Sequence, residues 1–494
     1  MFSLQSIGAL AISWPWLKPT LTALYALFIV VVICILIYDK RDPGKSWAWI
    51  AAIVLLPFAG FILYMVFGRN HRKEKLYNRK EISDLEIQME TLSARQLYEL
   101  NSPMFEYRQE IKRYKEIITL LLNNNKSLLT ARNRATVLHN GSETFPALLE
   151  ALRGAKSFIH IEYYIFKKDR VGREIANVLM EKARQGVEVR FIYDDVGSWG
   201  LSPKFLRRMK KAGVKVHCFQ RVVFPFLTSK INYRNHRKIV VVDGEVGFTG
   251  GINIAKRYLT GTKHGIWRDT HLKIEGEAVS TLNAVFAMDW FFVSREKLTE
   301  MDKYYPPSAI DIETPIQIAS SGPDSDWASI MQAFFAAITK AKDHIYISTP
   351  YFLPNQAIMT AVEVAAMSGV DVRILLPEKS DSKVVHWATK SYISELLEAK
   401  VKVYAYKKGF NHSKLIMIDS VFSSVGTANM DNRSFDVNFE VTAILYDEKV
   451  TRELEERFLE DLRDSEQVTQ KDWEGRPRWD SFREGLARLF SPLM

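Results

Sequence analysis

Cysteine is scarce in this sequence, since 494 residues contain only Cys34 and Cys218. Two cysteines cannot form a disulfide framework or a thiolate zinc site. The usual mark of a cleaved secretory signal is also missing, because no basic residue precedes Lys18 and a second apolar run follows the first. Positive charge, in contrast, is in excess, with a formal net charge of +10. That charge favours an anionic partner, either nucleic acid, an anionic membrane surface or a phosphorylated substrate, unless it serves solubility alone.

Two long runs near the N-terminus contain no charged residue, namely residues 21–38 and 46–67. Because a helix needs about 20 apolar residues to cross a bilayer, residues 1–70 are predicted to form a transmembrane hairpin. A pair of buried core helices is the alternative. Seven basic residues flank the outer ends of the two runs and three lie in the turn between them. The excess predicts that the rest of the chain lies in the cytoplasm.

The remainder of the chain is organised as a charged linker followed by a duplication. Residues 71–135 are predicted to be a charged helical linker that packs against the duplicated region. The segment AKSFIHIEYYIF (155–166) then matches AKDHIYISTPYF (341–352), and GVEVRFIYDD (186–195) matches GVDVRILLPE (369–378). Short β-rich runs alternate with helical ones in each half, which indicates α/β layers. We therefore expect two pseudo-symmetric α/β lobes, residues 136–310 and 311–494, which share one cleft.

Two further segments each leave two interpretations open. The stretch RVVFPFLTSKINYRN (221–235) mixes aromatic and basic residues, and either lies at a membrane interface or packs between lobes. The stretch WDSFREGLARLF (479–490) repeats apolar residues at helical spacing and predicts a C-terminal amphipathic helix. Its apolar face could lie on a membrane. Packing against a lobe is the commoner arrangement and is the one we expect.

One motif occurs twice, as NHRKIVVVDGEVGFTGGIN (235–253) and as NHSKLIMIDSVFSSVGTAN (411–429). The apolar runs in both copies predict strands, on which residues i and i+2 share a face. His236 and Lys238 should therefore project together, as should His412 and Lys414. Asp243 and Asp419 follow at the positions of a hairpin turn, and are expected to support the site without touching the reacting atoms.

The rest of the motif suits a bound anionic oxygen group. Gly250 and Thr427 lie where the backbone would come close to that group, and Asn253 and Asn429 can donate hydrogen bonds to it. Histidines and lysines from both copies could stabilise a phosphoryl transition state without a metal. One imidazole would attack phosphorus and the other would transfer protons.

Two carboxylates stand in similar places downstream of the two motifs. Asp269 lies in WRDTHLKIEG and Glu440 in SFDVNFEV, and they are the candidates for orienting the two histidines. Unrelated surface acids are the alternative. A metal site is not predicted, because no further histidine or acid falls at ligand spacing beside either motif.

At these residues the chain resembles the phospholipase D superfamily, which carries paired His-x-Lys-x4-Asp motifs, and it resembles bacterial cardiolipin synthases more closely still. The supporting stretches are the apolar hairpin, the two motifs, WRDTHLKIEGEAV and QIASSGPDSDW. The resemblance covers nearly the whole chain. The first motif has Gly-Gly-x-Asn where some members have Gly-Ser-x-Asn, which removes one hydroxyl donor.

The resemblance implies a function in the bacterial cytoplasmic membrane. Two phosphatidylglycerols would give cardiolipin and glycerol through a phosphatidyl-histidine, with no nucleotide or metal cofactor. It implies that His236 is the nucleophile and His412 the acid/base. Phosphatidylglycerol and anionic lipids would be the partners, and nucleic acid would not; the oligomeric state stays open.

Three other functions compete with this one. A membrane-bound phospholipase D hydrolase would use the same residues with water as the acceptor and would release phosphatidic acid. A nuclease of the superfamily would suit the net charge, although the hairpin argues against it. A non-catalytic scaffold is disfavoured because both motifs are intact.

Overall fold

The computed structural model describes residues 17–38, 43–56, 60–61, 63–64, 83–102, 109–222, 232–263 and 265–491. The chain divides into two compact units. The first comprises Met1–Arg69 with Phe224–Ile231, and the second Asn70–Val223 with Asn232–Met494. The basic residues that follow the second apolar run lie outside the described residues, as do residues 223–231 of the aromatic and basic stretch.

The first unit contains the helices α2 (Leu17–Tyr38) and α3 (Pro43–Leu55). They contact each other, with the Tyr25 hydroxyl donating to the carbonyl of Ile53 at 3.1 Å. The second apolar run is not one helix over residues 46–67, because α3 ends at Leu55, shortly before Pro57, which cannot donate a backbone hydrogen bond. Within the described ranges, no helix combines the length and apolarity needed to cross a membrane.

The second unit is built on one sheet, in the order β19-β13-β12-β10-β15-β16-β18-β9-β1-β8-β6-β5-β2-β3-β4. The strands from the first half of the chain are β1 (Leu129–His139), β2 (Phe158–Tyr163), β3 (Glu188–Asp194), β4 (Lys215–Phe219), β5 (Lys238–Val242), β6 (Val246–Gly250) and β8 (Thr270–Gly276). Those from the second half are β9 (Glu313–Ser321), β10 (His344–Ser348), β12 (Asp371–Pro377), β13 (Lys402–Tyr406), β15 (Leu415–Ile418), β16 (Phe422–Gly426), β18 (Glu440–Tyr446) and β19 (Ser465–Gln467).

The two halves of the sheet have the same topology. In each half, three neighbouring strands run parallel, and the strand of the repeated motif pairs antiparallel with the first of them: β5 pairs with β2, and β15 with β10. The segments that match in sequence form matching strands, β2 with β10 and β3 with β12. The antiparallel pairing of β1 with β9 joins the halves at the centre. The predicted pair of similar α/β lobes is therefore confirmed.

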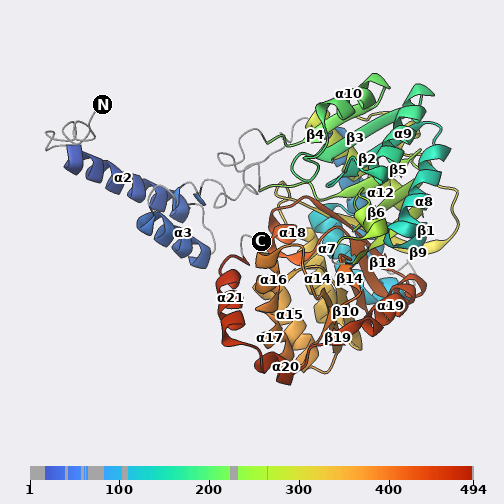
Figure 1. Cartoon of the computed structure of the whole chain (residues 1–494). Coiled ribbons are helices and arrows are strands. Elements are labelled where there is room, and N and C mark those ends of the chain that lie inside the picture. The colour runs from blue at the N-terminus through green and yellow to red at the C-terminus, as the bar shows by residue number, and fades with distance from the viewer. Residues whose placement is uncertain are drawn as a thin grey trace. The chain divides into compact units, whose positions relative to one another are not determined.

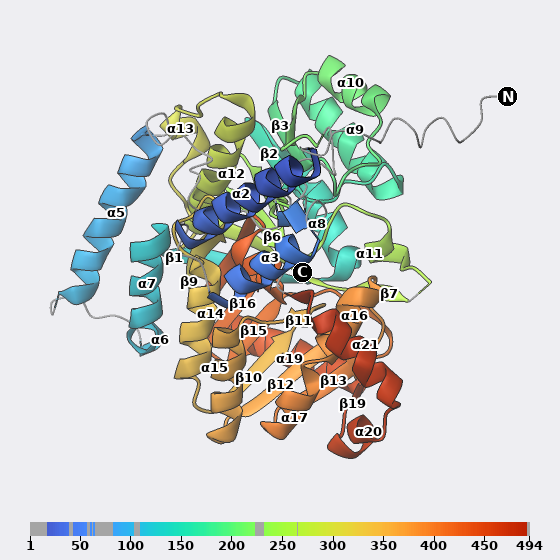
Figure 2. The same ribbon diagram turned by 90° about the vertical axis from the view of Figure 1, so that its left-hand side faces the viewer.

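Helices cover the sheet (Figures 1 and 2). Their buried side chains form three hydrophobic cores with those of the strands. In the first half, α8 (Asn140–Gly154), α9 (Arg170–Arg184) and α10 (Pro203–Lys211) pack on β2 and β3. In the second half, α14 (Ser329–Lys340), α15 (Gln356–Met367) and α17 (Ile393–Glu398) do the same on β10 and β12. The third core draws residues from both halves, with α12 (Ala278–Ser294) and α19 (Glu448–Arg463).

The segment before the duplication packs its helices against the second half of the sheet. It contains α5 (Ser83–Asn101), α6 (Gln109–Arg113) and α7 (Lys115–Asn125). Leu121 and Leu122 of α7 are buried in the same core as α14. β1 begins at Leu129, within the range predicted to be linker.

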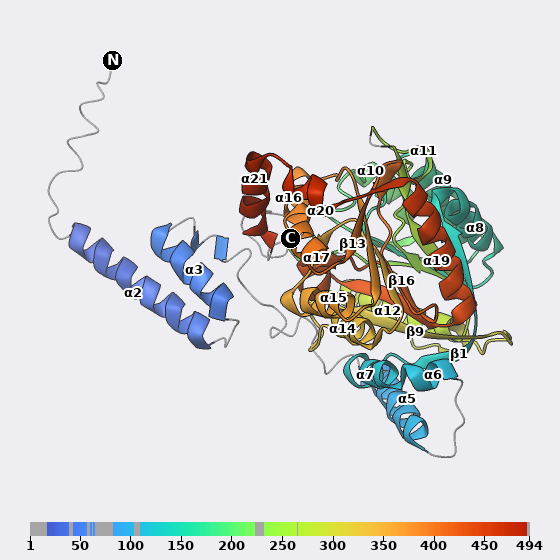
Figure 3. The ribbon, with the colours of Figure 1, turned by 90° about the horizontal axis from the view of Figure 1, so that it is seen from below.

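The C-terminal helices are α20 (Gln470–Glu474) and α21 (Arg478–Arg488). α21 lies beside α16 (Lys383–Lys390) in all three views (Figures 1 to 3). The prediction that the apolar face of residues 479–490 packs against a lobe is wrong, because Trp479, Phe482 and Leu486 are exposed. The helix contacts the lobe through Ala487, which is buried in the core of the second half, and through Arg488, which pairs with Glu395.

Candidate active site

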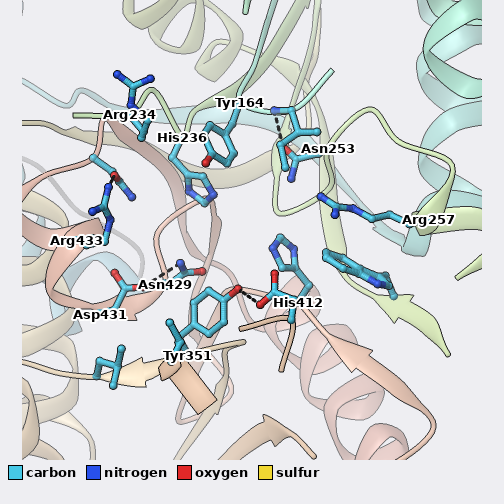
Figure 4. A pocket seen from close by; sticks show the side chains of 16 residues that line it. Tyr164, Arg234, His236, Asn253, Arg257, Tyr351, His412, Asn429, Asp431 and Arg433 are labelled. Carbon is cyan, nitrogen blue, oxygen red and sulfur yellow. Dashed lines mark hydrogen bonds between the residues drawn. The ribbon is translucent and has the colours of Figure 1, made fainter. Parts of the chain in front are cut away.

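The two motif histidines stand at equivalent ends of equivalent strands. His236 lies two residues before β5 begins at Lys238, and His412 lies between β14 (Gly409–Asn411) and β15. Both side chains line one cavity of about 460 Å³ (Figure 4). The prediction that the two copies meet in one cleft is therefore confirmed.

Each histidine is bound by a carboxylate from the other half of the chain. The Nδ1 of His236 lies 2.9 and 3.0 Å from the two carboxylate oxygens of Glu440. The Nδ1 of His412 lies 2.6 Å from Oδ2 of Asp269. Because each Nδ1 is engaged in this way, Nε2 is the nitrogen available to a substrate.

Backbone pairing between the halves brings each carboxylate to the histidine of the other half. The amide of His236 donates to the carbonyl of Phe439 at 2.9 Å, and the amide of His412 donates to the carbonyl of Arg268 at 2.7 Å. β7 (Ile266–Arg268) runs parallel to β14, so the residue after β7, Asp269, arrives beside His412. Glu440 begins β18 and reaches His236 in the same manner.

The residues Gly251 and Thr427 occupy equivalent positions and accommodate the two acids differently. A Cβ on Gly251 would lie 2.0 Å from Oδ1 of Asp269, so only glycine leaves room for that carboxylate. The hydroxyl of Thr427 donates to Oε2 of Glu440. Thr427 thus supports the acid that binds His236.

The motif lysines lie behind the histidines, where they do not line the cavity. Lys238 and Lys414 are buried, and each donates from Nζ to the backbone carbonyl of the histidine in its own motif. Nζ of Lys414 also lies 2.9 Å from Nδ1 of His412. Burial lowers the pKa of Lys238 to about 7 and that of Lys414 to about 8. Each lysine thus places a titratable positive charge near a histidine.

The motif aspartates lie at the far ends of the strands that carry the histidines. Asp243 accepts from the amides of Lys156, Ser157 and Phe158 at 2.7 to 2.8 Å. Asp419 accepts from the amides of residues 342, 343 and 344 at 2.8 to 3.0 Å. Their φ angles of 53° and 51° place them in the predicted hairpin turns. They fix the start of β2 and of β10.

The remaining residues predicted to bind substrate fall into two groups. Asn253 and Asn429 line the cavity. The side-chain amide of Asn253 is used within the protein, while Oδ1 of Asn429 has no hydrogen-bond partner among the described residues. Gly250 and Thr427 do not line it; a Cβ on Gly250 would lie 2.6 Å from Cα of His271, so its smallness serves strand packing.

Several cavity residues have no counterpart in the motif and were missed by sequence reasoning. They are aromatic or charged side chains from other segments, chiefly Tyr164, Arg234, Arg257, Trp267, Tyr351, Asp381, Asp431 and Arg433 (Figure 4). The guanidinium of Arg257 lies 4.1 Å from the ring centre of Trp267 and forms no ion pair with a described acid. Proximity to Asn253 in the sequence is the one signal that could have indicated Arg257.

The two histidine–carboxylate pairs differ in their electrostatics. Burial raises the pKa of Asp269 to about 7. Burial also acts on Glu440, but the neighbouring His236, Lys238 and Thr427 outweigh it and hold the pKa of that carboxyl below its ordinary value. The pKa of His236 is lowered by burial, and that of His412 is lowered by burial and by nearby cations, first among them Lys414. Without a bound anion, both imidazoles are therefore neutral at pH 7.

Comparisons with known proteins show the family to which this chain belongs. The family model described as "Cardiolipin synthase, PLD-like domain" matches residues 148–290 and 334–462, and the one described as "Phospholipase D-nuclease N-terminal" matches residues 26–69. The chain is 42% identical to a cardiolipin synthase of Geobacillus kaustophilus, over 95% of this chain and 94% of that one. It is 40% identical to cardiolipin synthase 2 of Staphylococcus epidermidis, over 96% of this chain and 97% of that one.

A solved structure shows the same fold at low sequence identity. The phosphatidylserine synthase of Haemophilus influenzae superposes with a TM-score of 0.57 and 13% identity, and the match covers 77% of this chain and all of that one. On the family model and the identity across nearly the full length, this chain belongs to the cardiolipin synthase family of the phospholipase D superfamily.

Proposed function

We propose that this protein is a cardiolipin synthase that transfers a phosphatidyl group between two phosphatidylglycerol molecules. One observation carries the proposal: two histidines, each bound by a carboxylate of the opposite half, line a single cavity. Paired imidazoles of this kind suit a double displacement at phosphorus, in which one ring is the nucleophile and the other moves protons.

In the first step, Nε2 of His236 attacks the phosphorus of one phosphatidylglycerol. The P–O bond to the headgroup glycerol breaks. His412, which gains a proton when the anionic phosphodiester binds beside it, donates that proton to the departing oxygen. A phosphatidyl-histidine remains. Glu440 supports this role for His236, because an ionised carboxylate on Nδ1 orients the ring and stabilises the positive charge that develops on it.

In the second step, His412 accepts the proton from the terminal hydroxyl of a second phosphatidylglycerol. That oxygen attacks phosphorus, the P–N bond breaks, and cardiolipin leaves while His236 is regenerated. Lys238 and Lys414 stabilise the charge on the phosphoryl oxygens from behind the histidines, and Oδ1 of Asn429 accepts a hydrogen bond from a glycerol hydroxyl.

Arg257 favours a lipid acceptor over water. It lines the cavity with no acidic partner among the described residues, and the second phosphatidylglycerol carries a phosphate of its own. A guanidinium binds phosphate through two parallel hydrogen bonds. A hydrolase uses water as its acceptor and would not need Arg257 to bind the phosphate of an acceptor lipid.

The proposal extends to the membrane. The uncharged runs at residues 21–38 and 46–67 anchor the protein in the bacterial cytoplasmic membrane as a hairpin, with the lobes at residues 136–310 and 311–494 in the cytoplasm. Residues 26–69 match the family model described as "Phospholipase D-nuclease N-terminal", so both runs overlap a segment that related proteins share. Anchoring keeps the site close to substrates that stay in the bilayer.

A product assay tests the proposal. The purified protein is incubated with phosphatidylglycerol in detergent, without metal or nucleotide, beside the variants His236→Ala and His412→Ala. His217→Ala, which removes a histidine outside the cavity, is the matched control. Cardiolipin and glycerol from the wild type and the control, but from neither site variant, are expected. Phosphatidic acid as the main product would make the protein a hydrolase.

A further inference from the structure

The C-terminal helix α21 has its polarity reversed relative to a helix that packs on a protein core. The large apolar side chains of α21 and the two residues after it, termed the α21 apolar face, are 49% to 75% exposed; they are Trp479, Phe482, Leu486, Leu489 and Phe490. On the same helix, Glu484 and Ala487 are buried. Large apolar side chains that gather on the surface of a folded protein mark an interaction surface.

Charged contacts hold α21 in this orientation. Arg476, just before the helix, lies 3.0 Å from Glu484, and the guanidinium of Arg488 pairs with both carboxylate oxygens of Glu395. Arg488 also lies 4.4 Å from the ring centre of Tyr392. Because Glu484 and Ala487 face inward and Arg488 pairs with Glu395, the apolar face of α21 points outward in this structure.

The composition of the outward face matches a helix at a lipid interface. Trp479 and Phe482 stack with ring centres 5.2 Å apart. The guanidinium of Arg483 lies over the rings of both Trp479 and Trp387. Helices that lie in the headgroup layer combine apolar and aromatic residues on one side with Arg or Lys at its border.

Helix α21 lies next to elements that line the active-site cavity. α21 packs on α16, whose Val384 is 44% exposed and whose Val385 lines the cavity. The side-chain amide of Asn432 donates to the carbonyl of Ser491, just after α21, and to that of Leu353, which also lines the cavity. These contacts link the helix that carries the exposed face to the wall of the cavity.

We propose that the α21 apolar face inserts into the headgroup layer of an anionic bilayer and holds the mouth of the cavity at the membrane surface. The choice of a bilayer as the occupant rests on the proposed function, since a lipid substrate must pass from a membrane into this cavity. It rests also on charge, because the exposed Arg478 and Arg483 border the face and would meet anionic headgroups.

Lipid-dependent quenching tests the insertion directly. In the full chain with Cys34→Ala and Cys218→Ala, single cysteines replace Phe482 or Leu486 and carry an environment-sensitive fluorophore. The protein is reconstituted in vesicles of phosphatidylcholine and phosphatidylglycerol, with or without brominated acyl chains. Ser481→Cys on the polar side of the same helix and Glu174→Cys on α9 are the controls.

Strong quenching by brominated lipid at positions 482 and 486, with little at 481 and 174, is the expected result. Equal, weak quenching at all four positions would overturn the proposal. So would emission at 482 that changes on dilution of the protein but not with brominated lipid, because that behaviour indicates a second copy of the chain on the face.

Activity provides a second, separable measurement. Phe482→Asp with Leu486→Asp is expected to lower turnover of phosphatidylglycerol in bilayers roughly tenfold, because two apolar anchors are lost. Turnover of a short-chain, dispersed substrate should fall far less, and Ser481→Asp should match the wild type. Equal loss on both substrates would contradict the inference. Since quenching needs no turnover, it can succeed even if no cardiolipin forms and the proposed function fails.

Discussion

At the residue scale, the two histidines occupy equivalent positions but have different acids. His236 binds Glu440, which stays ionised because its neighbours hold its pKa low. His412 binds Asp269, whose pKa is raised by burial to about 7. A nucleophilic imidazole benefits from a permanently ionised carboxylate at Nδ1, the nitrogen that does not face the substrate. An imidazole that must both gain and lose a proton is better served by a carboxyl group that is only partly ionised. The asymmetry supports His236 as nucleophile and His412 as acid/base.

Replacing these acids tests their role as positioning residues. Glu440→Gln and Asp269→Asn are each expected to lower kcat by about 10² to 10⁴, the range seen when the carboxylate of a catalytic triad is neutralised. KM should change little, since neither acid lines the cavity. Glu245→Gln, in an exposed turn of the same sheet, is the control. Steady-state kinetics in which both site variants retain wild-type kcat would refute a positioning role for the two acids.

The lysines predict a pH dependence. A lysine is cationic only below its pKa, so Lys238 and Lys414, at about 7 and about 8, lose their charge as the pH rises through that range. The free enzyme should therefore lose kcat/KM on the alkaline side of roughly pH 7 to 8. A bound phosphate diester raises the pKa values of both lysines. The alkaline fall in the pH profile of kcat should therefore lie at higher pH than the fall in kcat/KM. Coincident alkaline limbs in kcat and kcat/KM would show that the lysines do not meet the substrate's charge.

Arg257 gives a prediction about the acceptor. Arg257→Gln should raise KM for phosphatidylglycerol about tenfold or more, because one charge-assisted contact to phosphate is lost. Lys256→Gln, the exposed neighbouring cation, should have little effect. Initial rates over a range of lipid mole fractions measure both. An unchanged KM would assign the phosphate of the second lipid to another group.

At the scale of elements, the motif is a strand–turn–strand unit that occurs once in each half of the sheet. The histidine stands at one end of β5 or β15, and the aspartate in the turn at the other end. Because a whole strand separates them, the aspartate cannot touch the reacting atoms, although it belongs to the same motif. Its carboxylate satisfies the amides at the start of the adjacent strand.

Asp243→Asn is accordingly expected to lower the free energy of unfolding and to leave kcat nearly unchanged. An amide has one oxygen for three donors, so the loss should be about 1–3 kcal/mol. Denaturant unfolding of the variant should show the lower midpoint, while kcat of the folded protein stays within about threefold of wild type. Glu245→Gln, two residues later, controls for charge. A roughly hundredfold loss of turnover with an unchanged midpoint would instead make Asp243 catalytic.

The sequence predicts these units because their signals are local. Alternation of apolar residues defines the strands, and an Asp at the turn with positive φ suits the hairpin. It does not predict that Asp269 binds His412, because that contact depends on the pairing of β7 with β14 across the duplication. Nor does periodicity reveal which way the face of α21 points, since Arg488 and Glu395 meet only in the folded chain.

At the scale of the whole molecule, the duplication is one folded body with one site. β1 and β9 join the halves into a continuous sheet, and the third core takes side chains from both. Each half supplies one histidine, and each supplies the acid for the other half's histidine. Neither lobe therefore contains a complete site, and in this structure both lobes come from the same chain.

A mixing experiment tests this arrangement. The chains His236→Ala and His412→Ala, co-expressed with different affinity tags and co-purified, should together have no more activity than either alone. Were lobes exchanged between two chains, some sites would combine an intact His236 with an intact His412, and part of the wild-type activity would return. Each variant co-expressed with the wild type controls for expression. In the structure, each histidine and its acid come from different halves of one chain. Recovery of activity would therefore require halves of two different chains to pair through β1 and β9.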